Sequence, residues 1–437
     1  MGIKKPSTMI NSSLSSVSFT RYLSLSLLML LYVNSFVDRQ IIAVLGESIR
    51  QDLGLSFTDL GWLYGPSFSW VYAIMGLIMG RLADKTSRIR IILAGATVWS
   101  LATLVSGWVS SFSFLVALRM ALGLSQAALS PAVYSLLADL FPKEQRATVF
   151  SAYASAIFVG VGLSFLVGGS VAQAYDWRIS LQVLGVSGFF LVGLSFFGLV
   201  EPKRVDCQPN GGNSVNQGNP TASFGGEESV WHQIKDLLAK PALRYHLLGF
   251  GLLAMSGYTI LAFIGSIFTQ SFERVDLIPH YGWFLIVTAL AVTIAGWVTD
   301  HWAKHFGPRN RLAWGWISGL VSLPFLWVGL HSESPLIAFW FIGIGNVIAS
   351  SYNGVAAAII QFFARDDQRG LVGALYLFVV SVVGFGAGPP LAGWLSDEIF
   401  QGANAVASSV WSIYLICGIG SAGAFYLARK YYEQDIV

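Results

Sequence analysis

Long apolar runs alternate with short polar stretches along almost the whole chain. A helix that crosses a bilayer needs about 20 mostly apolar residues. Runs of that length, bounded by charged residues or turn signals, predict twelve membrane spans. The predicted spans cover residues 22–46, 59–80, 89–109, 113–137, 146–170, 179–200, 243–270, 280–300, 311–331, 335–361, 369–396 and 406–428.

The longest polar interval follows the sixth span and divides the spans into two groups of six. It is rich in Gly and carries no apolar period, which is typical of a flexible linker. Its last part, 229–239, is expected to form a short amphipathic helix on the membrane surface. The sequence thus predicts an all-α membrane protein with two six-helix bundles. The expected parts are a tail at 1–21, a bundle at 22–200, a linker at 201–242, a bundle at 243–428 and a tail at 429–437.

Composition and charge support this interpretation and orient the chain. Of 437 residues, 54% are hydrophobic and only 11% are charged, with a mean hydropathy of +0.63; a soluble domain has about 25% charged residues. Nearly all Lys and Arg fall on the side that holds the termini and the linker. The opposite side has only Arg50, Arg178 and Arg274, and two more cations, Arg39 and Arg119, fall inside spans. The positive-inside rule therefore predicts cytoplasmic termini, in an inner or plasma membrane.

One motif appears in both halves of the chain. The stretch Gly80-Arg81-Leu82-Ala83-Asp84-Lys85-Thr86-Ser87-Arg88 ends the second span, and Gly296-Trp297-Val298-Thr299-Asp300 ends the eighth. Repeated halves of this kind are typical of membrane transporters. We expect Asp84 to latch one conformation by accepting hydrogen bonds from the N-terminus of a neighbouring helix; the alternative is a cluster of charges that only sets topology. The candidate gate residues are Gly80, Asp84, Arg88, Arg146 and Asp300.

Only three ionisable side chains lie deep in apolar sequence: Asp38, Arg39 and Arg119. Each costs roughly 2.5–3.5 kcal/mol on insertion, so such residues are functional by default. Asn34 and Asp38 are four residues apart and share a helix face, whereas Arg39 points about 100° away. Asp38 is the candidate proton site. The alternative is a static Asp–Arg pair that holds helices together.

Two polar stripes follow helical spacing. In the fourth span Arg119, Gly123, Gln126 and Ser130 share one face, where a guanidinium could grip a carboxylate or phosphate; alternatively, Arg119 bonds backbone carbonyls. In the tenth span Asn346, Ser350 and Asn353 form a second stripe, which Tyr258 could join; such stripes also serve as contacts between helices. The candidate substrate and proton site comprises Asn34, Asp38, Arg39, Arg119, Gln126, Ser130, Tyr258, Asn346, Ser350 and Asn353.

The motif at 80–88 and the Arg119-Met120-Ala121-Leu122-Gly123 segment resemble those of the major facilitator superfamily. Further segments, at 34–39, 84–88, 139–142 and 177–178, resemble its Spinster-like branch and the bacterial relatives of that branch. The resemblance implies proton-linked or facilitated transport of lysolipids, sphingoid phosphates or other amphiphiles by a rocker-switch motion. Two positions depart from the pattern: Ser87 replaces a motif Gly, and Gln126 stands where relatives often carry Glu.

The function expected from these features is secondary active transport of a small amphiphilic or organic-anion solute by alternating access, coupled to protons. Alternatives are an uncoupled facilitator, a drug or lysolipid exporter, or a non-transporting scaffold or sensor. The chain carries no G-x-x-x-x-G-K-[ST] motif and no nucleophile–base pair within its spans, which argues against direct ATP drive and against an enzyme. His301 and His305 are four apart but lack a third ligand, so we expect no metal and no cofactor. The expected partners are the solute, protons and the lipid bilayer, without nucleic acid, and the protein is expected to be a monomer.

Overall fold

The computed structural model describes residues 7–202, 230–365 and 368–435. Within these residues the chain is helical apart from short connections. The helices of the N-terminal half are α1 (Ser7–Leu53), α2 (Phe57–Tyr64), α3 (Pro66–Lys85), α4 (Arg88–Ser106), α5 (Phe112–Ala127), α6 (Leu129–Leu140), α7 (Lys143–Leu163), the π-helical turn η1 (Ser164–Gly169), α8 (Ser170–Ala174) and α9 (Trp177–Gly198).

The helix α10 (Val230–Ala239) precedes the C-terminal half and confirms the short helix expected at 229–239. The helices of that half are α11 (Pro241–Phe272), α12 (Leu277–His280), α13 (Gly282–Phe306), η2 (Pro308–Leu312), α14 (Ala313–His331), α15 (Pro335–Ser350), α16 (Asn353–Ile359), η3 (Ile360–Phe363), α17 (Arg369–Val379), the π-helical turn η5 (Val380–Phe385), α18 (Gly386–Trp394), the π-helical turn η6 (Leu395–Ile399) and α19 (Ala405–Asp435).

Eleven helical stretches of the described chain are long and apolar enough to cross a membrane. With α2 and α3, they account for the twelve predicted spans. The second span differs from the prediction because it is interrupted: α2 ends at Tyr64 and α3 begins at Pro66. Proline has no N–H to donate and disfavours a helical conformation in the preceding residue, and Gly65 accordingly adopts a non-helical backbone there.

The first and last helices extend beyond the predicted spans into both expected tails. The helix α1 begins at Ser7 rather than near residue 22, and α19 continues to Asp435. Residues 7–21 contain neither Gly nor Pro. A helix nucleated within the span therefore propagates into this stretch at little cost.

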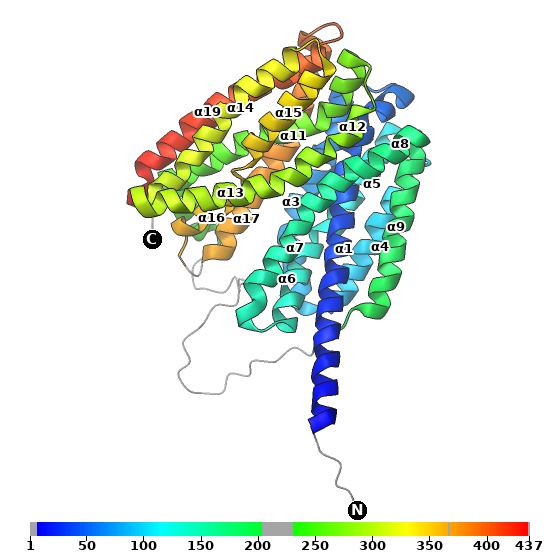
Figure 1. Ribbon diagram of the computed structural model, residues 1–437, viewed down its shortest axis with the longest axis vertical. Helices are drawn as coiled ribbons and strands as arrows, with labels where there is room; N and C mark the ends of the chain where they lie inside the picture. Colours follow the sequence, from blue (N-terminus) through cyan, green and yellow to red (C-terminus); the bar gives the residue numbers. More distant parts are fainter. Residues whose placement is uncertain (1–6, 203–229, 366–367, 436–437) are drawn as a thin grey trace, which may run out of the picture.

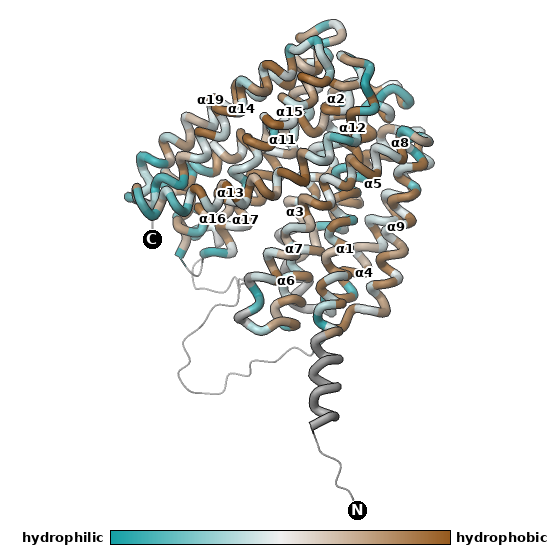
Figure 2. The backbone as a smooth tube through the Cα atoms, viewed as in Figure 1, coloured by the Kyte–Doolittle hydropathy of each residue, from teal (hydrophilic) through white to brown (hydrophobic). Residues whose placement is uncertain are grey.

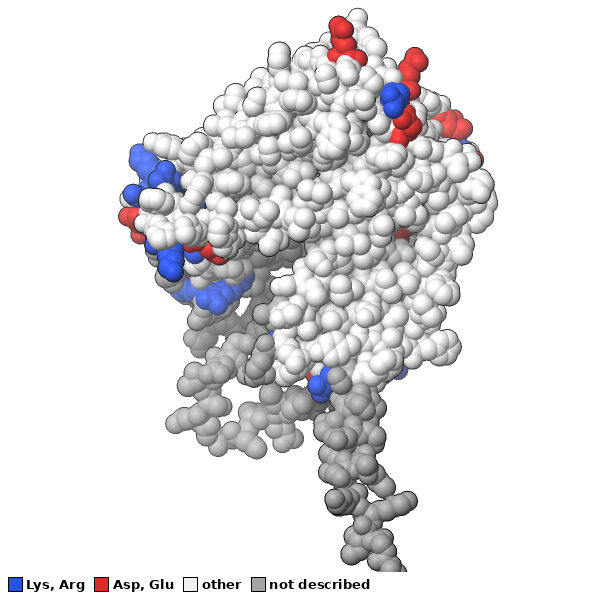
Figure 3. Space-filling model, viewed as in Figure 1, with Lys and Arg blue, Asp and Glu red and all other residues white. Residues whose placement is uncertain are grey.

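The two halves meet at one end of the molecule and separate at the other (Figure 1). At the closed end, α2 packs against α18, α12 against η1, and α1 against α11. Both termini lie away from this end, and the space-filling view shows the surface hollowed between the halves on the termini side (Figure 3). We call these two ends the closed end and the termini end.

The outer surface fits a bilayer. Hydrophobic residues run along the helices of both halves (Figure 2), and many large apolar side chains are exposed, Phe197 and Trp297 among them. In the view of Figure 3 the charged side chains gather at the two ends of the molecule and leave a broad uncharged band between them. An exposed apolar belt of this kind marks a surface that lies in lipid.

Candidate functional site

The centre of the N-terminal half holds the three deep charges, but they are arranged differently from a simple ion pair. Asp38 on α1 is 1% exposed, and its Oδ2 accepts a 2.7 Å hydrogen bond from Asn34 Nδ2. This contact confirms that the two residues share a helix face. Asp38 Oδ1 has no hydrogen-bond partner, and Asp38 makes no salt bridge within the described part of the chain. The static Asp38–Arg39 pair is therefore absent in this conformation.

Arg39 points away from Asp38 into a cage of aromatic rings. Its guanidinium carbon lies 4.5 Å from the ring centroid of Phe36 and 4.6 Å from those of Phe68 and Tyr72. Its Nη2 donates to Gln126 Oε1 at 3.2 Å, while its buried Nε has no hydrogen-bond partner among the described residues. Cation–π contacts stabilise a guanidinium without neutralising it. Arg39 thus remains a half-buried cation with hydrogen-bonding capacity left over.

Arg119 on α5 is 3% exposed, and its hydrogen bonds within the described residues all go to backbone carbonyls. Its Nη1 donates to the carbonyl of Asp38 at 3.2 Å, its Nη2 to that of Arg39 at 3.2 Å, and its Nε to that of Leu63 at 3.4 Å. This is the alternative arrangement raised by the sequence. In this conformation Arg119 ties α5 to α1 and α2, and Arg39 is the cation better placed to meet an anion.

The rest of the fourth-span stripe is used in several ways. Gln126 Nε2 donates to the carbonyl of Ser35 at 3.0 Å, so Gln126 bridges Arg39 and α1. Gly123 allows α5 to approach α3, because a Cβ there would lie 2.6 Å from the carbonyl oxygen of Phe68. Ser130 follows a helix interruption at Ala128 and is half-buried. Within this stripe, Arg119 and Gln126 make the hydrogen bonds to Arg39 and to the backbone of α1.

An aromatic bridge joins the two halves beside this centre. Phe385 in η5 lies 4.8 Å from Tyr64 and 5.8 Å from Phe68, and it stacks on Tyr258 of α11 at 4.6 Å between ring centroids. Since Phe68 also covers Arg39, ring contacts run from the N-terminal cation to the C-terminal half. Phe68 and Phe385 are not among the site residues predicted from the sequence. The available signal was the four-residue spacing of Phe68 and Tyr72, which places both rings on one face of α3.

The tenth-span stripe is not one surface. The helix α15 ends at Ser350 and α16 begins at Asn353, with a turn between them. Asn346 is buried and its Oδ1 accepts a 3.4 Å bond from Tyr414 Oη, Ser350 is half-buried, and Asn353 is exposed. Tyr258 stacks on Phe385 rather than joining this stripe. The predicted grouping of these four residues is therefore not found, because the helix break rotates the stripe.

The candidate gate residues have separate partners. Arg88 is 1% exposed and binds Asp139, Glu201 and the carbonyl of Ser135, which joins α4 to α6 and to the end of α9. Arg146 donates to the carbonyl of Phe141 at 3.3 Å, and Asp300 accepts from Arg311 at 3.0 Å. Nothing is described of the surroundings of Gly80 or of the side chain of Asp84, so the latch at Asp84 remains a prediction.

Glu201 stands just beyond the last helix of the N-terminal half. Partial burial acts to raise the pKa of its carboxyl. Hydrogen bonds from the Ser87 hydroxyl and from the Arg88 backbone and side chain outweigh that effect, and the pKa is lowered overall. The carboxylate is therefore the form that holds the start of α4 in place.

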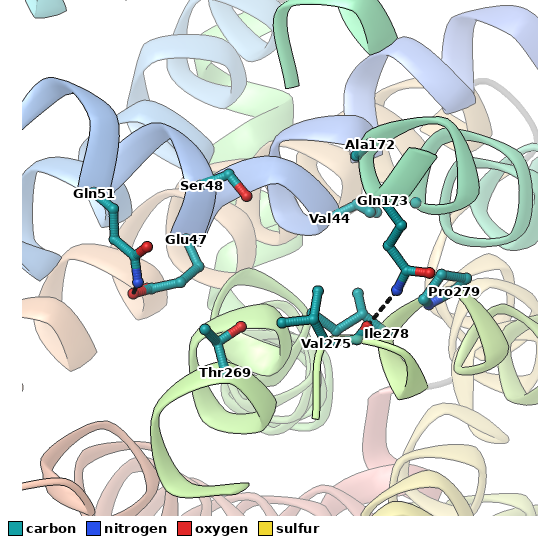
Figure 4. Close-up of a pocket in the computed structure, with 11 residues that line it drawn as sticks. Val44, Glu47, Ser48, Gln51, Ala172, Gln173, Thr269, Val275, Ile278 and Pro279 are labelled. Atoms are coloured by element: carbon teal, nitrogen blue, oxygen red, sulfur yellow. Dashed lines mark hydrogen bonds between the residues drawn. The ribbon is translucent and has the colours of Figure 1, made fainter. Parts of the chain in front are cut away.

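A small cavity of about 140 Å³ lies between the halves at the closed end (Figure 4). Glu47, Ser48 and Val44 of α1 line one wall, and Thr269 of α11 faces them. Gln173 crosses from α8 and donates to the carbonyl of Val275 at 2.5 Å. This cavity is not predicted from the sequence, because it forms only where three segments distant in sequence meet, at 44–51, 169–173 and 269–279.

Two helical halves that meet at one end, with buried charges at the centre of one half, define a class of protein. The model of the Major Facilitator Superfamily matches residues 28–389, so the chain belongs to that superfamily. Its members are transporters, and the expectation that the chain is no enzyme agrees with this assignment.

Within the superfamily the chain resembles the Spinster-like branch. It is 27% identical over 414 residues to an MFS-type efflux pump of Mycolicibacterium smegmatis, covering 92% of this chain and 91% of that one. It is 27% identical over 435 residues to protein spinster homolog 1 of Xenopus tropicalis, covering 93% and 81%. The crystal structure of a bacterial homolog to the human lysosomal transporter Spinster, in an inward-facing and unoccupied conformation, matches with a TM-score of 0.81 at 20% identity, covering 96% and 98%.

Proposed function

We propose that this protein is a secondary active transporter that moves a small amphiphilic or organic-anion solute by alternating access, coupled to protons. The observation that carries the proposal is the separation of Asp38 from Arg39. Adjacent residues of opposite charge lie at the centre of the molecule without neutralising each other. Each is thus available for a different ligand, the carboxylate for a proton and the guanidinium for an anion.

The surroundings of Arg39 support an amphiphilic solute. The rings of Phe36, Phe68 and Tyr72 surround the cation, and Phe385 and Tyr258 continue the apolar wall into the other half. An acidic headgroup would pair with the guanidinium, and an apolar body would pack against the rings. The efflux pump and the lysosomal transporter named among the relatives are compatible with such a solute.

The proposed orientation places the termini end in the cytoplasm. Basic side chains gather at the termini end in Figure 3, and acidic ones predominate at the closed end. This asymmetry follows the positive-inside rule. The conformation described here is then closed on the outside and open to the cytoplasm.

An uncoupled facilitator is the second candidate. It is favoured by Gln126, which provides an amide where a second carboxylate would allow another proton site. Both candidates keep Arg39 as the anion-binding group and differ only in the role of Asp38.

The experiment has two stages. A thermal-stabilisation screen of the purified protein with lysolipids, organic anions and drugs identifies a bound solute. Uptake of that solute into proteoliposomes is then measured with and without an imposed pH gradient. We expect saturable uptake that rises above equilibrium only with the gradient. Saturable uptake without gradient dependence identifies the facilitator, and an absence of flux for every solute that binds contradicts transport.

A further inference from the structure

At the closed end, one carboxylate of the C-terminal half caps a helix of the N-terminal half. Asp397 in η6 accepts from the backbone N–H of Phe57 at 3.1 Å through Oδ1. Its Oδ2 accepts from the N–H and the hydroxyl of Thr58, at 2.8 Å and 2.6 Å. The three donors belong to the first turn of α2. Thus a single side chain spans the boundary between the halves with three hydrogen bonds.

The start of α2 is built to receive this carboxylate. Helix starts leave backbone N–H groups without intrahelical partners and carry partial positive charge. Ser56 and Asp59 form a capping box that satisfies each other's N–H groups. The N–H groups of Phe57 and Thr58 remain, and Asp397 takes both. All four N–H groups from Ser56 to Asp59 are thus paired in this conformation, and those of Phe57 and Thr58 depend on contact between the halves.

Close backbone packing accompanies the cap. A Cβ on Gly61 of α2 would lie 2.4 Å from the carbonyl oxygen of Pro389, and a Cβ on Gly393 would lie 2.2 Å from that of Phe57. Only glycine fits at such distances. These two glycines bring α2 and α18 together on either side of the boundary, and this fixes Asp397 over the helix start.

A second contact across the boundary lies beside the first. Glu47 on α1 accepts a 3.1 Å bond from Gln270 on α11. Arg50 binds Glu47 at 2.9 Å and places its guanidinium 4.3 Å over the ring of Phe57. The same residue, Phe57, thus contacts both the Glu47–Arg50 pair and Asp397.

We propose that Asp397 is the latch of the closed end, and that its bonds to α2 break whenever this end opens. The inference rests on the alternating-access motion of the proposed function. It assigns to this end the device that the sequence predicted for Asp84 at the other: a carboxylate of one element on a helix N-terminus of another. When the end opens, Asp397 and the first turn of α2 separate and are hydrated independently. Loss of the carboxylate therefore shifts the equilibrium between the two conformations toward the open form.

The test measures the opening directly and needs no substrate. Nitroxides are attached through Tyr175→Cys in the N-terminal half and Glu333→Cys in the C-terminal half, both exposed beyond the spans at this end. The background carries Cys207→Ser and Cys417→Ala. Pulsed electron-spin distance distributions are recorded for the parent, Asp397→Asn, Thr58→Ala and the matched control Glu398→Gln, whose carboxylate is the exposed neighbour of Asp397.

We expect a predominantly short distance in the parent and in Glu398→Gln. Asp397→Asn should raise the ratio of long to short distances about fivefold, and Thr58→Ala, which removes only the hydroxyl bond, by a smaller factor. An Asp397→Asn protein that folds and keeps the parent distribution overturns the proposal. If that variant does not fold, Thr58→Ala decides: a shift supports the latch and an unchanged distribution overturns it. Because no solute is needed, failure of the latch is distinguishable from failure of the transport proposal.

Discussion

The two halves share the same helical plan, but their interiors differ in charge. The N-terminal half buries Asp38 and Arg119 at its centre and holds the half-buried Arg39 beside them. The C-terminal half has no Asp, Glu, Lys or Arg in the middle of any predicted span, and its centre presents Tyr258, Phe385 and the Asn346–Tyr414 pair. One half thus provides the electrostatics of the site, and the other provides an aromatic wall.

The ring contacts between the halves suggest how solute binding in the N-terminal half changes the position of elements in the C-terminal half. Arg39 is covered by Phe68, Phe68 contacts Phe385, and Phe385 stacks on Tyr258. Phe385 ends the π-helical turn η5, which leads into α18 and the contact with α2 at the closed end. π-Helical turns within α-helices frequently occur at functional sites. A solute that displaces the ring contacts would therefore act on the segment that closes the molecule.

The largest effect is expected at Arg119. Arg119→Ala removes three hydrogen bonds of a buried charge and leaves a cavity between α5 and α1, so the free energy of unfolding should fall by at least about 3 kcal/mol. Arg119→Lys should recover little, because an ammonium cannot reproduce the spread of the guanidinium donors. Thermal unfolding of the purified variants and the yield of folded protein measure this loss of stability. A stable Arg119→Ala protein that loses only solute binding would contradict the structural role and restore Arg119 as an anion ligand.

Charge selectivity should depend on Arg39. Arg39→Ala should weaken binding of an anionic solute about 10–100-fold while leaving a neutral analogue nearly unaffected. Arg39→Lys should keep part of the preference, since it retains the charge without the planar contacts to the rings. Isothermal titration with both solutes provides the measurement, with Arg274→Ala at the closed end as the control for a lost cation. Equal losses of affinity for the anionic and the neutral solute would contradict the assignment of charge recognition to the N-terminal half.

The aromatic wall should affect both solutes alike. Phe385→Leu shortens the ring contacts with Tyr258 and Phe68 while it retains apolar volume. We expect about a tenfold loss of affinity for charged and neutral solutes together. A loss of affinity confined to the anionic solute would show that the C-terminal half also contributes to charge selectivity.

The smallest effect concerns Glu201, at the edge of the N-terminal half. Its lowered pKa means that its contribution to stability is present above the ordinary carboxyl range and is lost as pH falls through the folded-state value. Glu201→Gln should lower the thermal midpoint by about 2–4 °C at neutral pH, with a smaller difference in acid. The control Glu333→Gln, at an exposed position, should leave the thermal midpoint unchanged both at neutral pH and in acid. A Glu201→Gln difference that grows in acid would contradict the assignment.

The sequence carries most of the fold and part of the site. Apolar runs predict the spans because lipid demands length and internal hydrogen bonding, and the rarity of buried charge identifies Asp38, Arg39 and Arg119. What these side chains bind depends on packing between helices. Arg119 bonds carbonyls of α1 and α2, and Asn353 leaves its stripe at a helix break. No sequence pattern identifies Asp397, since its partners lie in the other half.

The most direct test of the account concerns Asp38, the buried carboxylate of the charged half. Asp38→Asn keeps the size of the side chain and removes the proton site. Uptake of the identified solute is compared in proteoliposomes with and without a pH gradient, for the wild type and for Asp38→Asn. We predict that the variant loses gradient-driven accumulation and keeps exchange of solute down its own gradient. Accumulation that persists in Asp38→Asn would contradict the proposal that this residue couples protons to transport.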